Sequence, residues 1–146
     1  MDAKIETAIE KFTSGYNCAQ AVLYSFKDEL IIDGDASLKM ACGFGAGIGR
    51  KGEICGAVAG GIIAIGIKFG RGENDGKTAT EKTYSKTRGL MDKFEARYGT
   101  YICKELLDGC DLSTEEGQMY FRNYDLFNAT CKKCVGSVVQ ILEEIL

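Results

Sequence analysis

The 146-residue sequence contains no histidine, no proline and no tryptophan. Without histidine, the chain cannot form a Ser-His or Cys-His catalytic pair, and it offers no imidazole ligand to a metal ion. Without proline, the chain lacks the residue that most strongly breaks helices, which favours helices joined by glycine-containing turns. Any catalysis or metal binding must therefore depend on other side chains.

Strong positive charge and long apolar runs are missing as well. The formal net charge is −3, and the basic residues form only pairs such as Arg50-Lys51, so we expect no nucleic acid partner. The longest apolar run, residues 54–67, falls short of the ~20 residues that a membrane-spanning helix needs. We therefore expect a buried core helix there and a chain that is not membrane-spanning. The first twelve residues lack the apolar core of a signal peptide, which predicts a cytoplasmic location.

Apolar residues recur at helical spacing along most of the chain, whereas alternating strand patterns are not seen. The sequence predicts an all-α fold with a single domain, residues 1–146. This domain would be a compact bundle of about seven helices around a central glycine-rich apolar helix. The clearest helices are expected at residues 5–12, 18–30, 54–69, 77–98 and 131–146, with shorter ones near 36–44, 101–107 and 113–127.

Three polar positions predict where helices begin. Asn17 precedes Cys18, and Thr130 precedes Cys131, so each can cap the helix that follows it. The segment Ser113–Glu116 has the form of a capping box. These positions predict helix starts at residues 18, 114 and 131.

Glycines mark one loop and the packing faces of the central helix. The segment 43–52 is glycine-rich and predicts a loop or a loosely wound helix end. It contains a G-x-G-x-x-G pattern, but the strand and βαβ unit that a dinucleotide site needs are not indicated. In the central helix, Gly56 and Gly60, and then Gly66 and Gly70, are four residues apart. This spacing would let neighbouring backbones approach closely.

Cysteine is unusually abundant in this chain. A structural disulfide framework is disfavoured, because no secretion signal is seen and an odd number of cysteines cannot pair completely. Reactive or metal-bound thiolates are the leading interpretation, and simple burial of small apolar side chains is the alternative. The seven residues are Cys18, Cys42, Cys55, Cys103, Cys110, Cys131 and Cys134.

Four cysteines share a predicted context, since Cys18, Cys55, Cys103 and Cys131 each fall in the first turn of an expected helix. Unpaired N–H groups and the positive end of the helix dipole would stabilise a thiolate there and lower the cysteine pKa. A lowered pKa favours both nucleophilic thiol chemistry and metal ligation. Cys131 and Cys134 also form a C-x-x-C pair on one helix face, which could form a disulfide or chelate one ion.

The sequence around these cysteines resembles the C_GCAxxG_C_C family. The family's motif stands here as Cys55-Gly56-Ala57-Val58-Ala59-Gly60. The likeness extends to residues 15–22 and 44–50 before the motif, and to residues 103–107 and 131–134 after it. It covers roughly residues 5–145.

This resemblance implies a redox-active protein with four characteristic cysteines. They would be Cys18, Cys55, Cys103 and one of the final pair, with Cys131 favoured over Cys134. Cys42 and Cys110 would be additional cysteines without a part in that set. The resemblance implies no particular substrate.

Three functions fit these observations. The first is a four-thiolate centre, an Fe–S cluster or a zinc ion, held by Cys18, Cys55, Cys103 and Cys131 or Cys134. The second is a metal-free thiol–disulfide couple with Cys55 as the nucleophile. In either case the chain would be an oxidoreductase or an electron carrier with a redox partner. The third is a non-enzymatic helical interaction module, for example a homodimer, with structurally buried cysteines.

Overall fold

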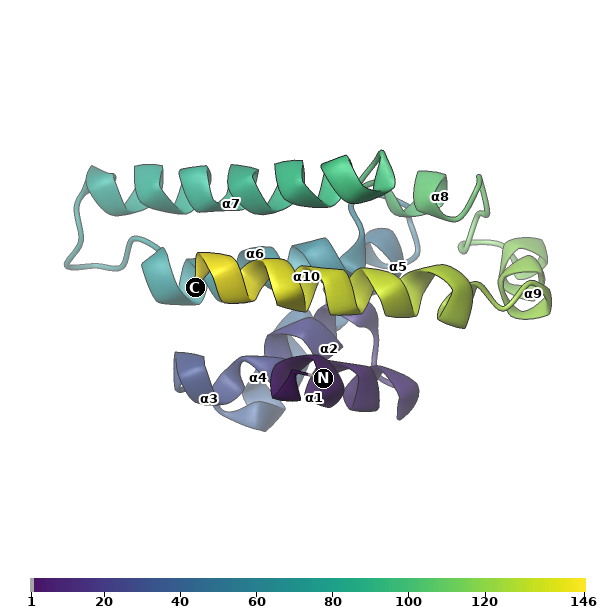
Figure 1. Ribbon diagram of the computed structural model, residues 1–146, viewed down its shortest axis with the longest axis horizontal. Coiled ribbons are helices and arrows are strands. Elements are labelled where there is room, and N and C mark those ends of the chain that lie inside the picture. The colour runs from purple at the N-terminus through teal and green to yellow at the C-terminus, as the bar shows by residue number, and fades with distance from the viewer. Residues whose placement is uncertain (1) are drawn as a thin grey trace.

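The computed structural model describes residues 2–146, and within them every regular element is a helix (Figure 1). A lone antiparallel bridge pairs Ile54 with Ile102. The predicted all-α class is confirmed, and the expected number of helices is roughly right. The elements are α1 (Ala3–Thr13), α2 (Cys18–Ser25), α3 (Lys27–Leu30), α4 (Gly34–Ala41), η1 (Cys42–Phe44), α5 (Gly45–Ile48), α6 (Gly56–Phe69), α7 (Lys77–Tyr98), α8 (Cys103–Leu106), α9 (Glu115–Asn123), η2 (Phe127–Cys131) and α10 (Lys132–Ile145).

The helix α6 is the centre of the molecule. It packs against α2, α7 and α10, and α10 also packs against α1 and α7. Figure 1 shows α7 along one side and α1, α3 and α4 along the other, with α6 and α10 between them. Eight residues of α6 are buried, as expected for the predicted core helix.

Two helix boundaries differ from the sequence prediction. The segment expected as one helix over residues 18–30 is divided into α2 and α3 at Phe26, and Ile31 then ends α3 in the left-handed conformation. The helix expected to start at residue 114 begins one residue later, because Thr114 is its N-cap and the Thr114 side chain accepts a hydrogen bond from the Gly117 N–H. The predicted capping box is wrong, because Gly117 has no side chain to return the bond. Local polar spacing therefore located the start of α9 to within a residue.

The glycine pair at the start of α6 forms a close helix–helix contact. A Cβ atom built on Gly60 would lie 2.5 Å from the carbonyl oxygen of Ala19 in α2, and one on Gly56 would lie 3.3 Å from the Cβ of Cys18. The predicted role of these two glycines is confirmed. It is wrong for Gly66, which has no atom within 4 Å of such a Cβ.

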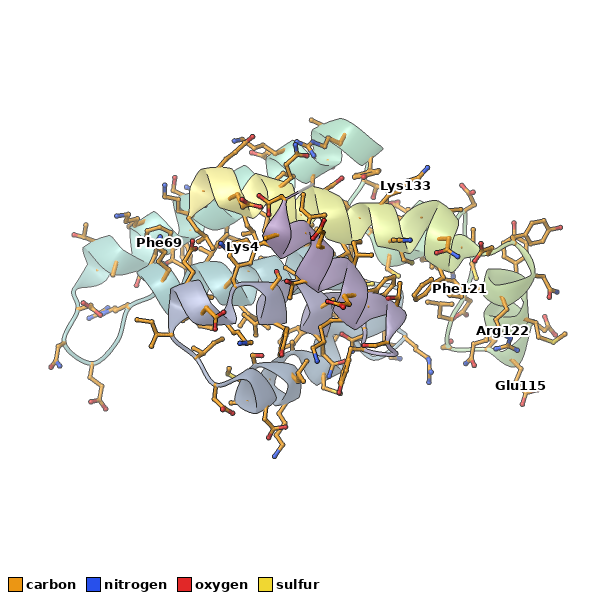
Figure 2. All side chains as sticks on the ribbon, turned by 60° about the horizontal axis from the view of Figure 1, so that its bottom comes forward. Lys4, Phe69, Glu115, Phe121, Arg122 and Lys133 are labelled. Atoms are coloured by element: carbon orange, nitrogen blue, oxygen red, sulfur yellow. The ribbon has the colours of Figure 1, made fainter. Side chains whose placement is uncertain are left out.

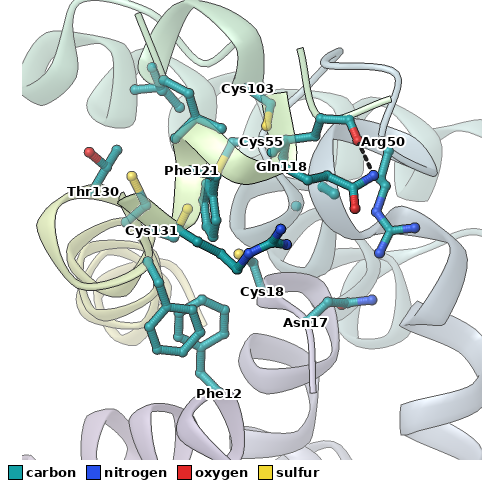
Figure 3. A pocket seen from close by; sticks show the side chains of 18 residues that line it. Phe12, Asn17, Cys18, Arg50, Cys55, Cys103, Gln118, Phe121, Thr130 and Cys131 are labelled. Carbon is teal, nitrogen blue, oxygen red and sulfur yellow. Dashed lines mark hydrogen bonds between the residues drawn. The ribbon is translucent and has the colours of Figure 1, made fainter. Parts of the chain in front are cut away.

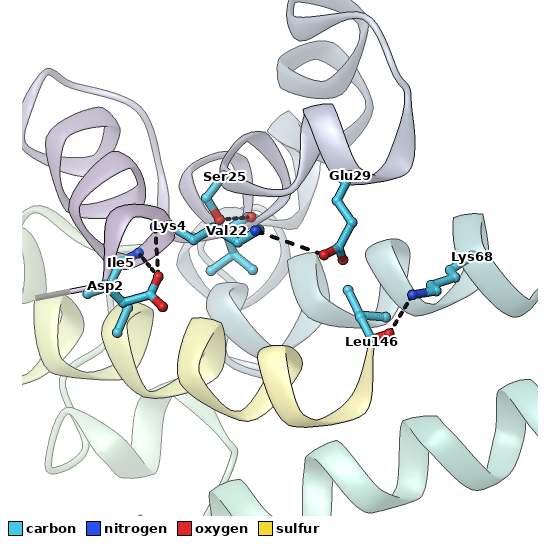
Figure 4. A network of polar contacts seen from close by, with 8 residues as sticks. All are labelled: Asp2, Lys4, Ile5, Val22, Ser25, Glu29, Lys68 and Leu146. Atoms are coloured by element: carbon cyan, nitrogen blue, oxygen red, sulfur yellow. Dashed lines mark hydrogen bonds and ion pairs between the residues drawn. The ribbon is translucent and has the colours of Figure 1, made fainter.

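Polar contacts fix the ends of several helices (Figure 4). The Asp2 carboxylate accepts hydrogen bonds from the backbone N–H groups of Lys4 and Ile5, which caps α1. The Lys68 ammonium at the end of α6 donates to the carbonyl oxygen of Leu146 after α10. These contacts lie far from the cysteines and serve the helix bundle itself.

The glycine-rich segment after η1 has an unusual backbone. Residues 46–50 all have positive φ angles, and three of them, Ala46 (54°), Ile48 (66°) and Arg50 (69°), are not glycine. The Gly49 N–H donates to the Gly45 carbonyl at 3.0 Å, which closes a left-handed turn. Left-handed residues with a Cβ are energetically unfavourable, so packing around the segment must hold this turn in place.

No helix in residues 2–146 combines the length and apolarity needed to cross a membrane. The apolar α6 has 14 residues.

The close contact of α2 and α6 can be tested with two matched substitutions in α6. Gly60→Ala should lower the free energy of unfolding by about 2 kcal/mol, because the new methyl group would overlap backbone atoms of Ala19. Gly66→Ala is the control, and it should raise that free energy by up to about 1 kcal/mol because the position is open and alanine favours a helix. Urea denaturation followed by circular dichroism measures both. Equal effects of the two substitutions would contradict the close contact.

Candidate functional site

Five of the seven cysteines line one cavity of about 330 Å³ (Figure 3). They come from segments that are far apart in the sequence, and all lie at the end of the bundle near α9. The rest of the lining is mainly apolar. The five are Cys18, Cys55, Cys103, Cys131 and Cys134.

Helix capping places Cys18 at the cavity. Asn17 is the N-cap of α2 in a complete capping box: its side chain accepts a hydrogen bond from the Gln20 N–H, and its own backbone N–H donates to the Gln20 side chain. The Asn17 side-chain amide also donates to the carbonyl of Cys42 at 2.8 Å. Cys18 is therefore the first residue of α2, as the sequence predicted.

A short backbone pairing places Cys55 beside Cys103. The Cys55 N–H donates to the Tyr101 carbonyl at 2.7 Å, and the Cys103 N–H donates to the Glu53 carbonyl at 2.6 Å. Cys55 is the N-cap of α6, and Cys103 is the first residue of α8. The segments before the two helices are thereby joined, and both thiols lie at helix starts as predicted.

The predicted first-turn position of Cys131 is wrong. Thr130 makes no capping hydrogen bond, and Cys131 is the last residue of the π-helical turn η2, with helical angles that continue into α10. The ring of Phe127 in this turn stacks on Phe12 of α1 at 4.2 Å. The cysteine in the first turn of α10 is Cys134.

One cavity cysteine has a lowered pKa. The pKa of Cys55 lies below the ordinary thiol value, chiefly because its sulfur accepts a hydrogen bond from the Cys134 thiol. The backbone N–H groups of Val58 and Ala57 in the first turn of α6 add to this effect, against the opposing effect of burial. Among the cavity cysteines with a resolved shift, Cys55 is thus the one that ionises most readily, in agreement with its predicted helix-start environment.

The expected lowering does not hold for the other cavity thiols with a resolved shift. A hydrogen bond with Cys131, together with burial, raises the pKa of Cys18 well above the ordinary thiol value. Burial raises the pKa of Cys103 to about 12. The pKa of Cys134 is raised because its proton is shared with Cys55. Burial and neighbouring sulfurs therefore outweigh the helix dipole at Cys18 and Cys103.

The remaining two cysteines lie outside the cavity lining. Cys42 is exposed in η1. Cys110 is buried in a small separate cluster with Cys103 and Leu107, and its thiol donates to the Gly117 carbonyl at 3.0 Å.

All seven cysteines are free thiols. Within residues 2–146, no three Cys, Asp or Glu side chains are arranged to hold one metal ion. Among the cavity cysteines, Cys134 is the neighbour with the largest effect on the pKa of Cys55, and Cys131 is the neighbour with the largest effect on that of Cys18.

Several cavity residues were not recognised from the sequence. Part of the apolar wall of the cavity is formed by Phe12, Phe121 and Phe127. The positive charges of the lining come from Arg50 and Arg122. A weak signal in the sequence exists for α9, where Phe121 and Arg122 follow Gln118 by three and four residues and so lie near it on one helix face. The left-handed turn that carries Arg50 has no comparable signal.

The fold and the cavity define a small all-helical protein whose cysteines converge from distant segments onto one pocket. The chain matches the family described as "Putative redox-active protein (C_GCAxxG_C_C)" over residues 16–145, and it therefore belongs to that family. It is also similar to an "Uncharacterized protein" of Archaeoglobus fulgidus, with 29% identity over 116 residues that cover 75% of this chain and 77% of the relative. No solved structure matches the chain.

The different environments of Cys55 and Cys103 predict different alkylation rates. Both cysteines are buried and line the same cavity, so the reagent reaches the two thiols by a similar route and a difference in rate reflects mainly their pKa values. Near neutral pH, Cys55 should react faster with iodoacetamide by about tenfold for each unit between the two pKa values. As the pH is raised, the alkylation rate of Cys55 should reach its plateau at a pH below the ordinary thiol pKa. The alkylation rate of Cys103 should still increase above pH 10, because the pKa of Cys103 is about 12. Pulsed labelling with peptide mass spectrometry measures both rates, and faster labelling of Cys103 would contradict the assignment.

Proposed function

We propose that this protein is a thiol–disulfide redox protein whose working pair is Cys55 and Cys134. The observation that carries the proposal is that Cys55 and Cys134 line the same accessible cavity, where the neighbouring Cys134 thiol lowers the pKa of Cys55. A thiolate beside a second, protonated thiol is the arrangement that disulfide exchange requires. Membership of a family described as redox-active supports the same conclusion.

The reaction would proceed in two exchanges. The Cys55 thiolate attacks one sulfur of a disulfide substrate RSSR, which breaks the S–S bond, releases one thiolate RS⁻ and leaves Cys55 in a mixed disulfide. Cys134 then loses its proton to that leaving thiolate and attacks the Cys55 sulfur, which forms the Cys55–Cys134 disulfide and releases the second RS⁻, protonated by solvent. Overall, two protein thiols are oxidised and one disulfide is reduced to two thiols.

The surrounding groups have distinct tasks in this mechanism. The N–H groups of Ala57 and Val58 stabilise the Cys55 thiolate. Apolar side chains around the cavity limit water near the sulfurs, which strengthens these electrostatic contacts. Cys18 and Cys131 line the same cavity and offer a second pair of thiols there.

Single substitutions distinguish the nucleophile from the resolving thiol. In a Cys42→Ser background, uncharged dithiodipyridine should produce a disulfide that links the Cys55 and Cys134 peptides. Cys55→Ser should abolish that link, whereas Cys134→Ser should trap a stable mixed disulfide on Cys55. Thiol titration with peptide mass spectrometry reads all three results. Cys110→Ser is the matched control, because Cys110 lies outside the cavity lining and its loss should leave the link intact. Incorporation of Cys134 into an intramolecular disulfide at an undiminished rate in Cys55→Ser would refute the assignment.

An Fe–S cluster is a second candidate, favoured by the number of thiols at the cavity. Four cysteine ligands hold the common clusters, and five cysteines line this cavity. A single ion does not fit the side chains as arranged in residues 2–146, but a cluster binds its cysteines through different irons and so accepts sulfurs that are farther apart. The ligands would be Cys18, Cys55, Cys103 and Cys131 or Cys134, and the bound cluster would supply one-electron transfer.

Metal analysis separates the two candidates. On the thiol–disulfide proposal, anaerobically purified protein should be colourless and contain iron, zinc and acid-labile sulfide at well under one equivalent per chain. Stoichiometric iron and sulfide, with visible absorption that is lost in Cys55→Ala, would instead establish the cluster. Stoichiometric zinc without sulfide would contradict both candidates.

A further inference from the structure

Two arginines lie at the edge of the cavity that contains the thiols. Arg50 follows α5 and Arg122 lies on α9, and both side chains are exposed. Figure 3 shows Arg50 on the side of the cavity away from Cys131 and Thr130. The described residues that line the cavity include no Asp or Glu. The lining therefore carries two positive charges and no carboxylate to balance them.

Neither guanidinium group has a protein partner within residues 2–146. The ion pairs there all involve lysines. Arg97 and Arg71, by contrast, donate to the side chain of Gln140 and to the carbonyl of Asp75. A guanidinium presents five N–H donors in a planar fork that matches a carboxylate or a phosphate. Arg50 and Arg122 thus leave these donors available to a ligand in the cavity.

The backbone holds Arg50 in a fixed position relative to the thiols. Arg50 ends the left-handed turn of residues 46–50, and Gly47 in that turn packs so closely on Cys103 that a Cβ on it would lie 2.7 Å from the Cys103 Cβ. Strained backbone of this kind persists where the surrounding structure over-determines it, and it is concentrated at binding and catalytic sites. The turn therefore joins a positive charge to the thiol cluster.

The aromatic part of the cavity lining is suited to an apolar body. Phe12 and Phe127 form a stacked pair there, and Phe121 precedes Arg122 on α9 (Figure 2). The cavity volume of about 330 Å³ lies within the range of small-molecule sites. An aromatic or aliphatic ligand body would thus contact the phenylalanines while its charged group lies at the edge of the cavity.

We infer that this cavity binds a low-molecular-weight disulfide that carries carboxylate groups on an apolar body. Arg50 and Arg122 hold a carboxylate at the cavity edge, and the phenylalanine wall orients the body so that a sulfur of the disulfide faces Cys55. This inference builds on the proposed thiol–disulfide function and names its substrate class. The substrate disulfide is reduced to two carboxylated thiols as Cys55 and Cys134 become oxidised, so atoms and electrons balance as in the exchange above.

A pair of probe disulfides with different charge tests the substrate class. Dithiobis(nitrobenzoate) is aromatic and dianionic, whereas dithiodipyridine is aromatic and uncharged. We would measure the rate constant for oxidation of the reduced Cys42→Ser protein by each probe, and divide it by the constant for the neutral thiol mercaptoethanol. The normalised constant for the dianionic probe should exceed that for the uncharged probe by about tenfold, and the excess should shrink as salt is added.

Arginine substitutions should remove that preference selectively. Arg50→Gln and Arg122→Gln should each lower the constant for the dianionic probe by about fivefold, as expected for loss of one charge-assisted contact at an exposed site. The constant for the uncharged probe should stay within about twofold. Arg88→Gln is the matched control, because Arg88 is an exposed arginine of α7 outside the cavity lining. A wild-type preference near one, or a preference that survives in the double variant, would overturn the inference.

A binding measurement separates this inference from the redox chemistry. Nitrobenzoate carries the same ring and carboxylate but no disulfide, so it needs no reactive thiol. It should raise the melting temperature of the reduced wild-type protein, and the rise should be lost in the Arg50→Gln/Arg122→Gln variant but kept in Cys55→Ser. Absence of any rise in the wild type would overturn the anion site. If nitrobenzoate binds but neither disulfide oxidises Cys55, the proposed function fails while the anion site stands.

Discussion

The rest of the structure depends on the close approach of α2 and α6. Gly60 allows the backbone of α2 to lie against α6, where a Cβ atom would overlap the backbone of Ala19. A Cβ atom on Gly56 would be in tight contact with Phe44, Gly45 and Cys18. Cys55 precedes Gly56 directly, so the same contact that builds the core also brings Cys18 and Cys55 to one cavity. The motif Cys55-Gly56-Ala57-Val58-Ala59-Gly60 therefore has a physical explanation. It places one thiol at the start of a helix, and its two glycines, four residues apart, then form the surface on which a neighbouring helix packs.

Around this contact, each further cysteine is positioned by a different local device. The backbone pairing of residues 53–55 with 101–103 brings in Cys103, and the π-helical turn η2, stacked on α1 through Phe127 and Phe12, brings in Cys131. Cys134 follows one turn later on α10. Burial in a shared apolar cavity then separates the thiols by pKa, because a hydrogen bond that stabilises one sulfur as a thiolate holds the proton on its neighbour.

Local sequence signals predicted the helices well and the site in part. Helical periodicity, the cap at Asn17 and the apolar run of α6 each depend on residues a few positions apart, and these features agree with the structure. The predictions that were wrong depended on the tertiary surroundings of a residue. Thr130 resembles a cap, yet the chain before Cys131 is already helical, and Gly66 has the spacing of a contact glycine but no helix against it.

The sequence by itself determined the helical class, the abundance of thiols, the absence of imidazole chemistry and the start of most helices, because these follow from composition and short-range spacing. Only the tertiary structure decided which cysteines line one cavity, which of them has a lowered pKa, and that Arg50 and Arg122 border the same cavity. The distance in space between two segments that are tens of residues apart in the sequence is set by tertiary packing, and not by the number of residues between them. A pKa likewise depends on burial and on partners that the linear sequence does not display.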